Sequence, residues 1–266
     1  IIGRLVGSEM CIRDRALSIL QLLGLFDRPA TADCLNALWT GDPIPGLTDS
    51  LVNLSETERN GALTRLESAR LLTVNRDESR RLVSVDTHPL IREYFARQLR
   101  GTNPDESREV WRAAHRRLYE HLCETTNEGD QPTLEELQPL YQAVAHGCHA
   151  GLNEDELANI YRDRILKGAD HYAWHKLGAF GSELGALACF FLRPWTQLVS
   201  GMTESGQAWL FHETAFCLRA SGRLPEALES MHAALARRID QENWIEAAKG
   251  ANNLSELELT LGGVSG

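Results

Sequence analysis

The chain has 266 residues, of which 43% are hydrophobic and 24% are charged, a composition typical of soluble globular proteins. Its formal net charge of −10 argues against nucleic acid as the main partner, because binding to phosphates requires positive potential. No apolar run approaches the ~20 residues that a membrane-spanning helix needs, and the six cysteines form no CxxC pair, which indicates free thiols in the reducing cytoplasm.

The first fifteen residues stand apart from the rest of the chain. The run Val6–Arg15, VGSEMCIRDR, resembles a peptide translated from sequencing-adapter DNA. It lacks the apolar segment and the small-residue cleavage site of a signal peptide. We therefore assign residues 1–15 to a non-native peptide. At the other end the chain stops inside a repeating pattern, so we expect a fragment whose native termini are missing.

Residues 16–100 have the element order of a winged-helix domain. Helices are predicted over 16–26 and 31–39, and Ser55–Glu58 is a capping box that begins a third helix, which ends near Ala69. Two short strands are predicted at 71–74 and 82–85 around a polar turn, and a further helix follows Pro89. Three helices and a β-hairpin, closed by one more helix, predict a winged-helix-like domain.

His88 stands at the corner between the second strand and the following helix. Pro89 suits the first helical position, because its missing N–H would have no intrahelical partner. Proline also holds the preceding residue in extended geometry. The imidazole would then lie near a helix N-terminus, where backbone donors and the helix dipole favour an anion. A cap made by the ring itself explains the same position, and both interpretations stay open.

A winged helix can also bind DNA, and the helix over 55–70 would then enter the groove. Glutamates and arginines alternate along this helix, which is typical of a solvated surface. A DNA-reading helix presents clustered basic and amide side chains without repelling carboxylates. The hairpin turn does hold Arg76, Arg80 and Arg81, which could contact phosphate. Direct DNA binding is therefore an alternative hypothesis and not the leading one.

The remainder of the chain is predicted to be helical, without strands. Gly, Asn, Pro and acidic residues over 101–106 indicate a linker. A helical-hairpin region is assigned to 107–202. The helices expected in this region cover 110–123, 134–150 after the capping box Thr133–Glu136, 153–167 and 172–192.

Residues 203–266 carry the clearest periodic signal. Gly222 and Gly262 recur in leucine-rich contexts, at a spacing longer than the standard period of ~34 residues in a tetratricopeptide repeat (TPR). The segment resembles a TPR of extended period, with Phe211 and Ile239 in place of the consensus tryptophan and proline. Two unrelated helical hairpins are the alternative. The residues expected to pack the repeats are Ala215, Leu218, Gly222, Ala227, Met231, Ala234 and Gly262.

A winged helix joined through the segment HPLIREYF to helical repeats resembles the C-terminal part of bacterial STAND-class, NB-ARC-like signalling ATPases. In that family a histidine of a Met-His-Asp motif contacts the β-phosphate of ADP. Thr87, His88 and Pro89 align with the motif, and proline replaces its aspartate. The resemblance implies that residues 16–100 form a nucleotide-state switch in which His88 senses nucleotide. It also implies an upstream nucleotide-binding domain that shares ADP or ATP with His88, and a protein partner or effector on the repeats.

The chain carries no catalytic motif, and we do not expect an enzyme. It has no GxxxxGK[ST] loop to bind phosphates and no GxSxG nucleophile elbow. No metal site is predicted either, because neither the group His146, Cys148 and His149 nor the pair His171 and His175 has further converging ligands. No cofactor is expected within the fragment itself.

Together these patterns predict a mainly α protein, with a winged-helix domain and small β-hairpin followed by a TPR-like solenoid. The leading hypothesis is a regulatory, protein-interaction fragment of a STAND-type signal-transduction NTPase. The alternatives are a DNA-binding winged-helix transcriptional regulator with a TPR sensor, and a plain TPR adaptor.

Overall fold

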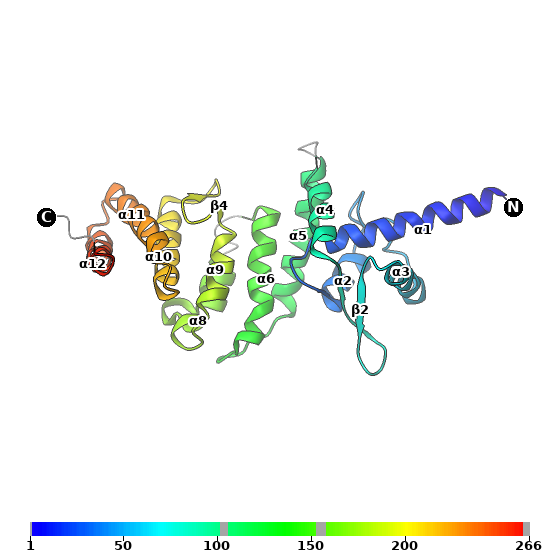
Figure 1. Ribbon diagram of the computed structural model, residues 1–266, viewed down its shortest axis with the longest axis horizontal. Coiled ribbons are helices and arrows are strands. Elements are labelled where there is room, and N and C mark those ends of the chain that lie inside the picture. The colour runs from blue at the N-terminus through cyan, green and yellow to red at the C-terminus, as the bar shows by residue number, and fades with distance from the viewer. Residues whose placement is uncertain (1, 102–105, 153–157, 263–266) are drawn as a thin grey trace. The chain divides into compact units, whose positions relative to one another are not determined.

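A computed structural model of the chain describes residues 2–101, 106–152 and 158–262, and for 2–12, 106 and 107 it describes the backbone alone. Most of the predicted linker, and the predicted start of a helix at Asn153, lie outside the described residues. The protein is mainly helical with a small antiparallel sheet (Figure 1). It divides into two compact units, residues 1–122 and 123–266, so that 107–122 belong with the first unit.

The first unit surrounds a three-stranded sheet with helices. Ser55 and Glu58 form the predicted capping box, in which Ser55 Oγ accepts from the Glu58 N–H at 3.3 Å and the Glu58 carboxylate accepts from the Ser55 N–H at 3.0 Å. The first helix is longer than predicted, because it also includes residues 2–15. The elements are α1 (Ile2–Leu23), β1 (Ala30–Thr31), α2 (Ala32–Thr40), α3 (Glu56–Ser68), β2 (Thr73–Arg76), β3 (Leu82–Asp86), α4 (Pro89–Arg100) and α5 (Glu106–Thr125).

Strand β3 is the centre of the sheet. It pairs antiparallel with β1 on one side, where Ala30 lies opposite Val85, and with β2 on the other, where Val74 lies opposite Val85. The strand order is therefore β1-β3-β2, and α2 and α3 come between β1 and β2 along the chain. The very short strand β1 was not predicted, because it cannot show alternation.

The core of the first unit lies where α1 meets α4 and α3. Gly24 follows α1 directly and lies against the backbone of α4: a Cβ built on it would be 2.7 Å from the Ala96 nitrogen and 2.9 Å from the Phe95 carbonyl carbon. Both of these atoms belong to the backbone of α4, which cannot move aside as a flexible side chain could. The largest fully buried side chains of this unit include Ile19, Leu22, Leu23, Leu35, Leu38, Leu47, Leu51 and Leu63.

The second unit consists almost entirely of helices. The capping box of Thr133 and Glu136 at the start of α6 is confirmed, and Arg164 secures the loop after α5 through two hydrogen bonds to the Glu128 carboxylate, of 2.6 and 2.8 Å. Its elements are α6 (Leu134–Ala150), the π-helix η1 (Asn159–Ile165), η2 (Gly168–Asp170), α8 (Tyr172–His175), α9 (Phe180–Ala188), β4 (Phe191–Arg193), β5 (Gln197–Leu198), α10 (Glu204–Ala220), α11 (Leu224–Asp240) and α12 (Trp244–Thr260).

The single helix predicted over 172–192 is wrong. Gly178 adopts a left-handed conformation, with φ of 60°, and its N–H bonds to the Trp174 carbonyl, which ends the first helical segment. The chain starts again as α9 and then forms the β4–β5 hairpin, although no strand was expected here. Gly178 therefore interrupts the segment 172–192, in which apolar residues have helical spacing both before and after it.

The last three helices repeat at equal intervals. Each has 17 residues, and each is followed by one residue in the left-handed conformation: Gly222 (φ 75°), Glu242 (φ 55°) and Gly262 (φ 77°). The turn at Glu242 lies midway along the chain between the other two. The first two turns are closed by equivalent hydrogen bonds, from Arg223 N to Leu218 O in one and from Asn243 N to Arg238 O in the other. The interval between the two glycines thus contains two equivalent helix–turn units.

Replacing Gly24 by alanine tests the contact between α1 and α4. We expect Gly24→Ala to lower the free energy of unfolding by about 1–3 kcal/mol, because the added methyl group overlaps backbone atoms on α4. Urea unfolding followed by circular dichroism measures this change. The control is Gly61→Ala within α3, where nothing lies within 4 Å of the new Cβ and alanine should stabilise by about 0.5–1 kcal/mol. Equal effects of the two substitutions would contradict the packing argument.

Candidate functional site

His88 is the N-cap of α4. Its ring Nδ1 accepts a hydrogen bond from the Leu90 N–H at 3.2 Å, and its carbonyl oxygen accepts from the N–H groups of Ile91 and Arg92. The capping interpretation of His88 is therefore confirmed. Because Nδ1 is the acceptor, the neutral ring carries its proton on Nε2, and that N–H can donate to a ligand. The residue is exposed, so capping and anion binding are compatible.

Two side-chain bridges fix the corner that holds His88. The Thr87 hydroxyl donates to the Leu71 carbonyl at 2.6 Å, which joins the corner to the segment before β2. The Arg92 guanidinium donates to the Asp27 carbonyl at 2.9 Å and forms an ion pair with the Asp86 carboxylate. Arg92 is thus neutralised within the corner, and His88 is left as the donor that the corner presents to solvent.

Exposed apolar side chains accompany His88 on α4. Leu90 is 73% exposed and Tyr94 is 57% exposed, and their i,i+4 spacing puts them on one face of the helix. The opposite face of α4, with Phe95 and Leu99, is buried in the core. A surface that combines an N–H donor with two large apolar groups is suited to contact with another protein domain.

Two of the three hairpin arginines that could contact DNA have side-chain partners within the first unit. Arg76 donates to the Asn60 side chain at 3.1 Å and to the Arg80 carbonyl at 3.2 Å, and Arg81 forms an ion pair with Asp77 at 2.9 Å. These contacts stabilise the turn, but the Arg81 side chain is 80% exposed, so the hairpin keeps positive charge at its surface.

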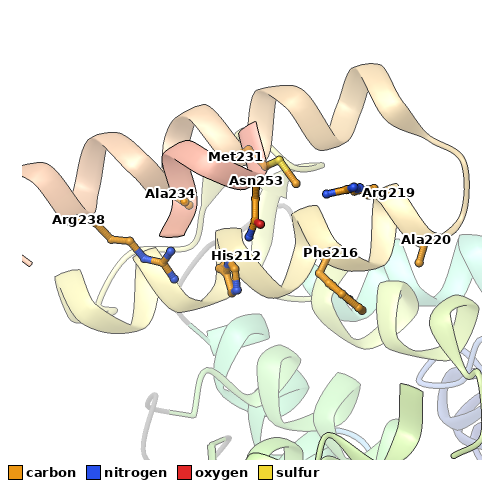
Figure 2. A pocket seen from close by; sticks show the side chains of 9 residues that line it. His212, Phe216, Arg219, Ala220, Met231, Ala234, Arg238 and Asn253 are labelled. Carbon is orange, nitrogen blue, oxygen red and sulfur yellow. The ribbon is translucent and has the colours of Figure 1, made fainter. Parts of the chain in front are cut away.

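A cavity of about 230 Å³ lies among the last three helices of the second unit (Figure 2). Of the residues expected to pack the repeats, Met231 and Ala234 line it, whereas Ala215, Leu218 and Ala227 are buried between helices and Gly222 and Gly262 form turns. The remaining lining residues are His212, Phe216, Arg219 and Ala220 from α10, Arg238 from α11, and Gly250 and Asn253 from α12.

Arg238 gives the cavity a buried positive charge. Its side chain is only 8% exposed, it donates to the Glu246 carbonyl at 3.2 Å, and it forms an ion pair with the Glu246 carboxylate at 3.8 Å. The guanidinium lies beside Gly250, where any Cβ would be 3.4 Å from Nη1. Sequence reasoning missed Arg238, although its position continues the buried register of Ala227 and Ala234 along α11.

The rest of the cavity combines neutral polar and apolar groups. Burial, together with the nearby Arg238 charge, lowers the pKa of His212 to about 4, so the imidazole is neutral near pH 7. Asn253 points toward His212 from α12, and Phe216 and Met231 lie on the side of the cavity away from Arg238 (Figure 2). Arg219 faces a carboxylate already, that of Glu256 at 3.2 Å. The arrangement is suited to an apolar group that also carries an acidic one.

Two buried glutamates lie at the centre of the second unit. Glu183 of α9 accepts hydrogen bonds from the hydroxyls of Tyr141 on α6 and Tyr161 in η1. Glu213 of α10 is 2% exposed, and its Oε2 has no hydrogen-bond partner among the described residues. Burial raises the pKa of Glu183, and burial together with the Glu183 charge raises the pKa of Glu213 to about 8.

Neither of the histidine and cysteine groups named from the sequence is among the groups of described residues whose potential ligand atoms converge. The rings of His171 and His175 are 6.1 Å apart at their centroids, and Cys148 instead pairs with Cys189 through a thiol hydrogen bond. Among the described residues, one group of three places its potential ligand atoms within 4.8 Å of one another: Asp33, Cys34 and His121. This group was not predicted, because Cys34 and His121 lie far apart in the sequence.

Comparison with protein-family models, with curated proteins and with solved structures finds no match to this chain. None of the described helices combines the length and the apolar character that crossing a membrane requires. The residues and their geometry therefore carry the functional argument.

The raised pKa of Glu213 predicts that stability falls with pH. Folded Glu213 keeps its proton up to about pH 8, whereas the unfolded chain loses it near 4.5, so the folded state binds more protons between these values. The free energy of unfolding should decrease across this window, by on the order of 3–5 kcal/mol at pH 8. Glu213→Gln should remove most of this decrease, and Glu183 accounts for part of the remainder.

Urea unfolding at pH 5 and pH 8, followed by tryptophan fluorescence, measures the effect. Glu229→Gln, at an exposed position on α11, is the matched control and should keep the wild-type difference between the two pH values. A Glu213→Gln protein with the same pH dependence as the wild type would show that another group causes it.

Proposed function

We propose that this chain is a non-catalytic regulatory and protein-interaction fragment of a STAND-type signal-transduction NTPase. In this proposal the first unit is a winged-helix-like nucleotide-state switch and His88 senses ADP held by an upstream nucleotide-binding domain. The last three helices are TPR-like repeats that bind a protein partner. Binding at either place would shift the population between closed and open states.

The observation that carries the proposal is the topology of the first unit. A β1-β3-β2 sheet, with two helices between β1 and β2 and a hairpin from β2 to β3, is the arrangement expected of a winged helix. In the family that the chain resembles, the nucleotide-sensing histidine lies at a strand-to-helix corner. His88 lies at the corresponding corner, after β3. The exposed apolar face of Leu90 and Tyr94 beside His88 supports contact with a further domain.

The equal spacing of the last three helices supports the repeat interpretation. Helix–turn units of equal length that end in the same left-handed turn are what stacked helical repeats require, because each unit packs only against its neighbours. Trp244 and Ile245 at the start of α12 are 64% and 73% exposed, so this end of the array presents apolar surface. The cavity among α10, α11 and α12 adds a place where a partner's side chain can be enclosed.

Two substitutions of His88 separate nucleotide sensing from helix capping. In a protein that carries the upstream nucleotide-binding domain, His88→Asn should keep the cap, because asparagine caps helices well, yet remove the Nε2–H donor. We expect it to weaken ADP binding about 10–100-fold, the loss of one hydrogen bond to a charged group. Isothermal titration calorimetry measures ADP affinity.

His88→Ala provides the complementary result. It should weaken ADP binding equally and also lower the free energy of unfolding by about 1 kcal/mol, because the cap is lost. If His88→Ala, which has no side-chain donor, binds ADP as the wild type does, His88 is only a cap and the sensor role is wrong.

The cavity predicts the chemistry of the partner segment. Peptides selected by phage display on this chain should combine an apolar side chain with an acidic group, and Arg238→Gln should weaken their binding about 10–100-fold, because a charge-assisted contact is lost. Ala220→Trp, at an exposed position on the cavity wall, should block binding by filling the space.

Arg97→Gln, which changes a surface arginine paired with Glu93 on α4, is the matched control and should bind normally. Fluorescence polarisation with the selected peptides provides the affinities. Selection of basic peptides, or binding unaffected by both cavity variants, would exclude this cavity as the partner site.

A further inference from the structure

Asp33, Cys34 and His121 converge in the first unit from two helices far apart in sequence. Asp33 and Cys34 belong to the first turn of α2, and His121 lies near the end of α5. His121 Nε2 is 3.1 Å from Asp33 Oδ2, and Cys34 Sγ is 4.0 Å from the same oxygen. All three ligand atoms lie within 4.8 Å of one another. Carboxylate, thiolate and imidazole are the three side-chain groups that zinc most often uses.

The spacing of these atoms is close to that of a tetrahedral site. Zinc bonds of about 2.3 Å to sulfur and about 2.0–2.1 Å to nitrogen or oxygen put neighbouring ligands roughly 3.3–3.6 Å apart. The two observed separations lie on either side of this range, at 3.1 and 4.0 Å. The exposed Asp33 side chain can rotate to change both separations, and the third, between Cys34 Sγ and His121 Nε2, is within 4.8 Å.

The surroundings of the three residues also suit an ion. Cys34 is 1% exposed, yet a carboxylate and an imidazole face its thiol where a buried cysteine usually meets apolar groups. The Asp33 and His121 side chains are 57% and 20% exposed, so an ion has a path from solvent.

We propose that Asp33, Cys34 and His121 form a zinc site that clamps the start of α2 to α5, with water as the fourth ligand. The ion replaces the direct hydrogen bond between Asp33 and His121 and closes the long loop of chain between Cys34 and His121. This role is independent of the STAND-type proposal, because it requires neither nucleotide nor a partner. It departs from the sequence analysis, which predicted no metal site.

Binding releases the thiol proton to solvent, because the thiolate is the form that coordinates. Zinc affinity should therefore rise with pH.

Cobalt(II) titration of the full, chemically reduced chain tests the proposal. Cobalt replaces zinc in tetrahedral sites and shows a thiolate-to-cobalt charge-transfer band in the near ultraviolet, together with visible bands that report tetrahedral geometry. We expect one cobalt ion per chain with both features, and their loss when one equivalent of zinc is added. Absence of the thiolate band at micromolar cobalt overturns the proposal.

Variants assign the ligands. Cys34→Ser should abolish the charge-transfer band, and His121→Gln should weaken cobalt binding by more than about 100-fold, since loss of an outer partner alone costs about 10–100-fold. His121→Gln changes a partly exposed side chain, so it remains informative if Cys34→Ser fails to fold. Circular dichroism monitors folding of each variant.

Two matched controls exclude other sites. His232→Gln changes a surface histidine that also faces a carboxylate, that of Glu258 at 3.6 Å, but without a thiol beside it. Cys189→Ser disrupts the neighbouring thiols Cys148 and Cys189. Both should bind cobalt as the wild type does. Unchanged binding in Cys34→Ser and His121→Gln, or loss in Cys189→Ser, overturns the assignment.

Discussion

The close backbone contact between α1 and α4 determines where the first unit presents His88. Gly24 lets α4 lie directly on the end of α1, which buries Phe95 and Leu99 and leaves Leu90 exposed. The Arg92 contacts with Asp27 and Asp86 then hold the first turn of α4 against the sheet. A side chain at position 24 would move the whole helix, so the position of the histidine depends on a residue much earlier in the chain.

The second unit depends on a different constraint, the burial of carboxyl groups among helices. Glu183 links α9 to α6 and η1. Its buried carboxylate oxygens need hydrogen-bond donors, and the hydroxyls of Tyr141 and Tyr161 supply them. Glu213 lies in the same region, its Oε2 has no partner among the described residues, and burial together with the Glu183 charge raises its pKa to about 8, so it keeps its proton at neutral pH. A polar centre of this kind costs stability relative to an apolar core, but it favours one arrangement of the helices that meet there.

Local patterns in the sequence predict most helices and almost none of the long-range polar contacts. The capping boxes at Ser55 and Thr133 are contiguous signals, and the structure contains both. The prediction of one long helix is wrong at Gly178. A left-handed glycine ends the helix there, but the apolar residues before and after it keep helical spacing, so the sequence pattern does not show the break. The position of His88 at a strand-to-helix corner could be predicted, because a strand pattern precedes it and Pro89 follows it. Arg238 contacts Glu246 of α12, and His121, which meets Asp33 and Cys34, lies on α5. No local periodicity encodes which helices meet.

The equal turns after α10, α11 and α12 bear on how this part of the protein can evolve. A segment of one or two helix–turn units copied in tandem begins and ends in the same left-handed conformation, so duplication lengthens the array without inventing a new turn. Glu242 occupies that conformation in place of a glycine, at a steric cost of about 1–2 kcal/mol. Packing between neighbouring helices therefore allows the residue at a turn to change. Copies of the unit can diverge in sequence while the length of each helix–turn unit stays the same.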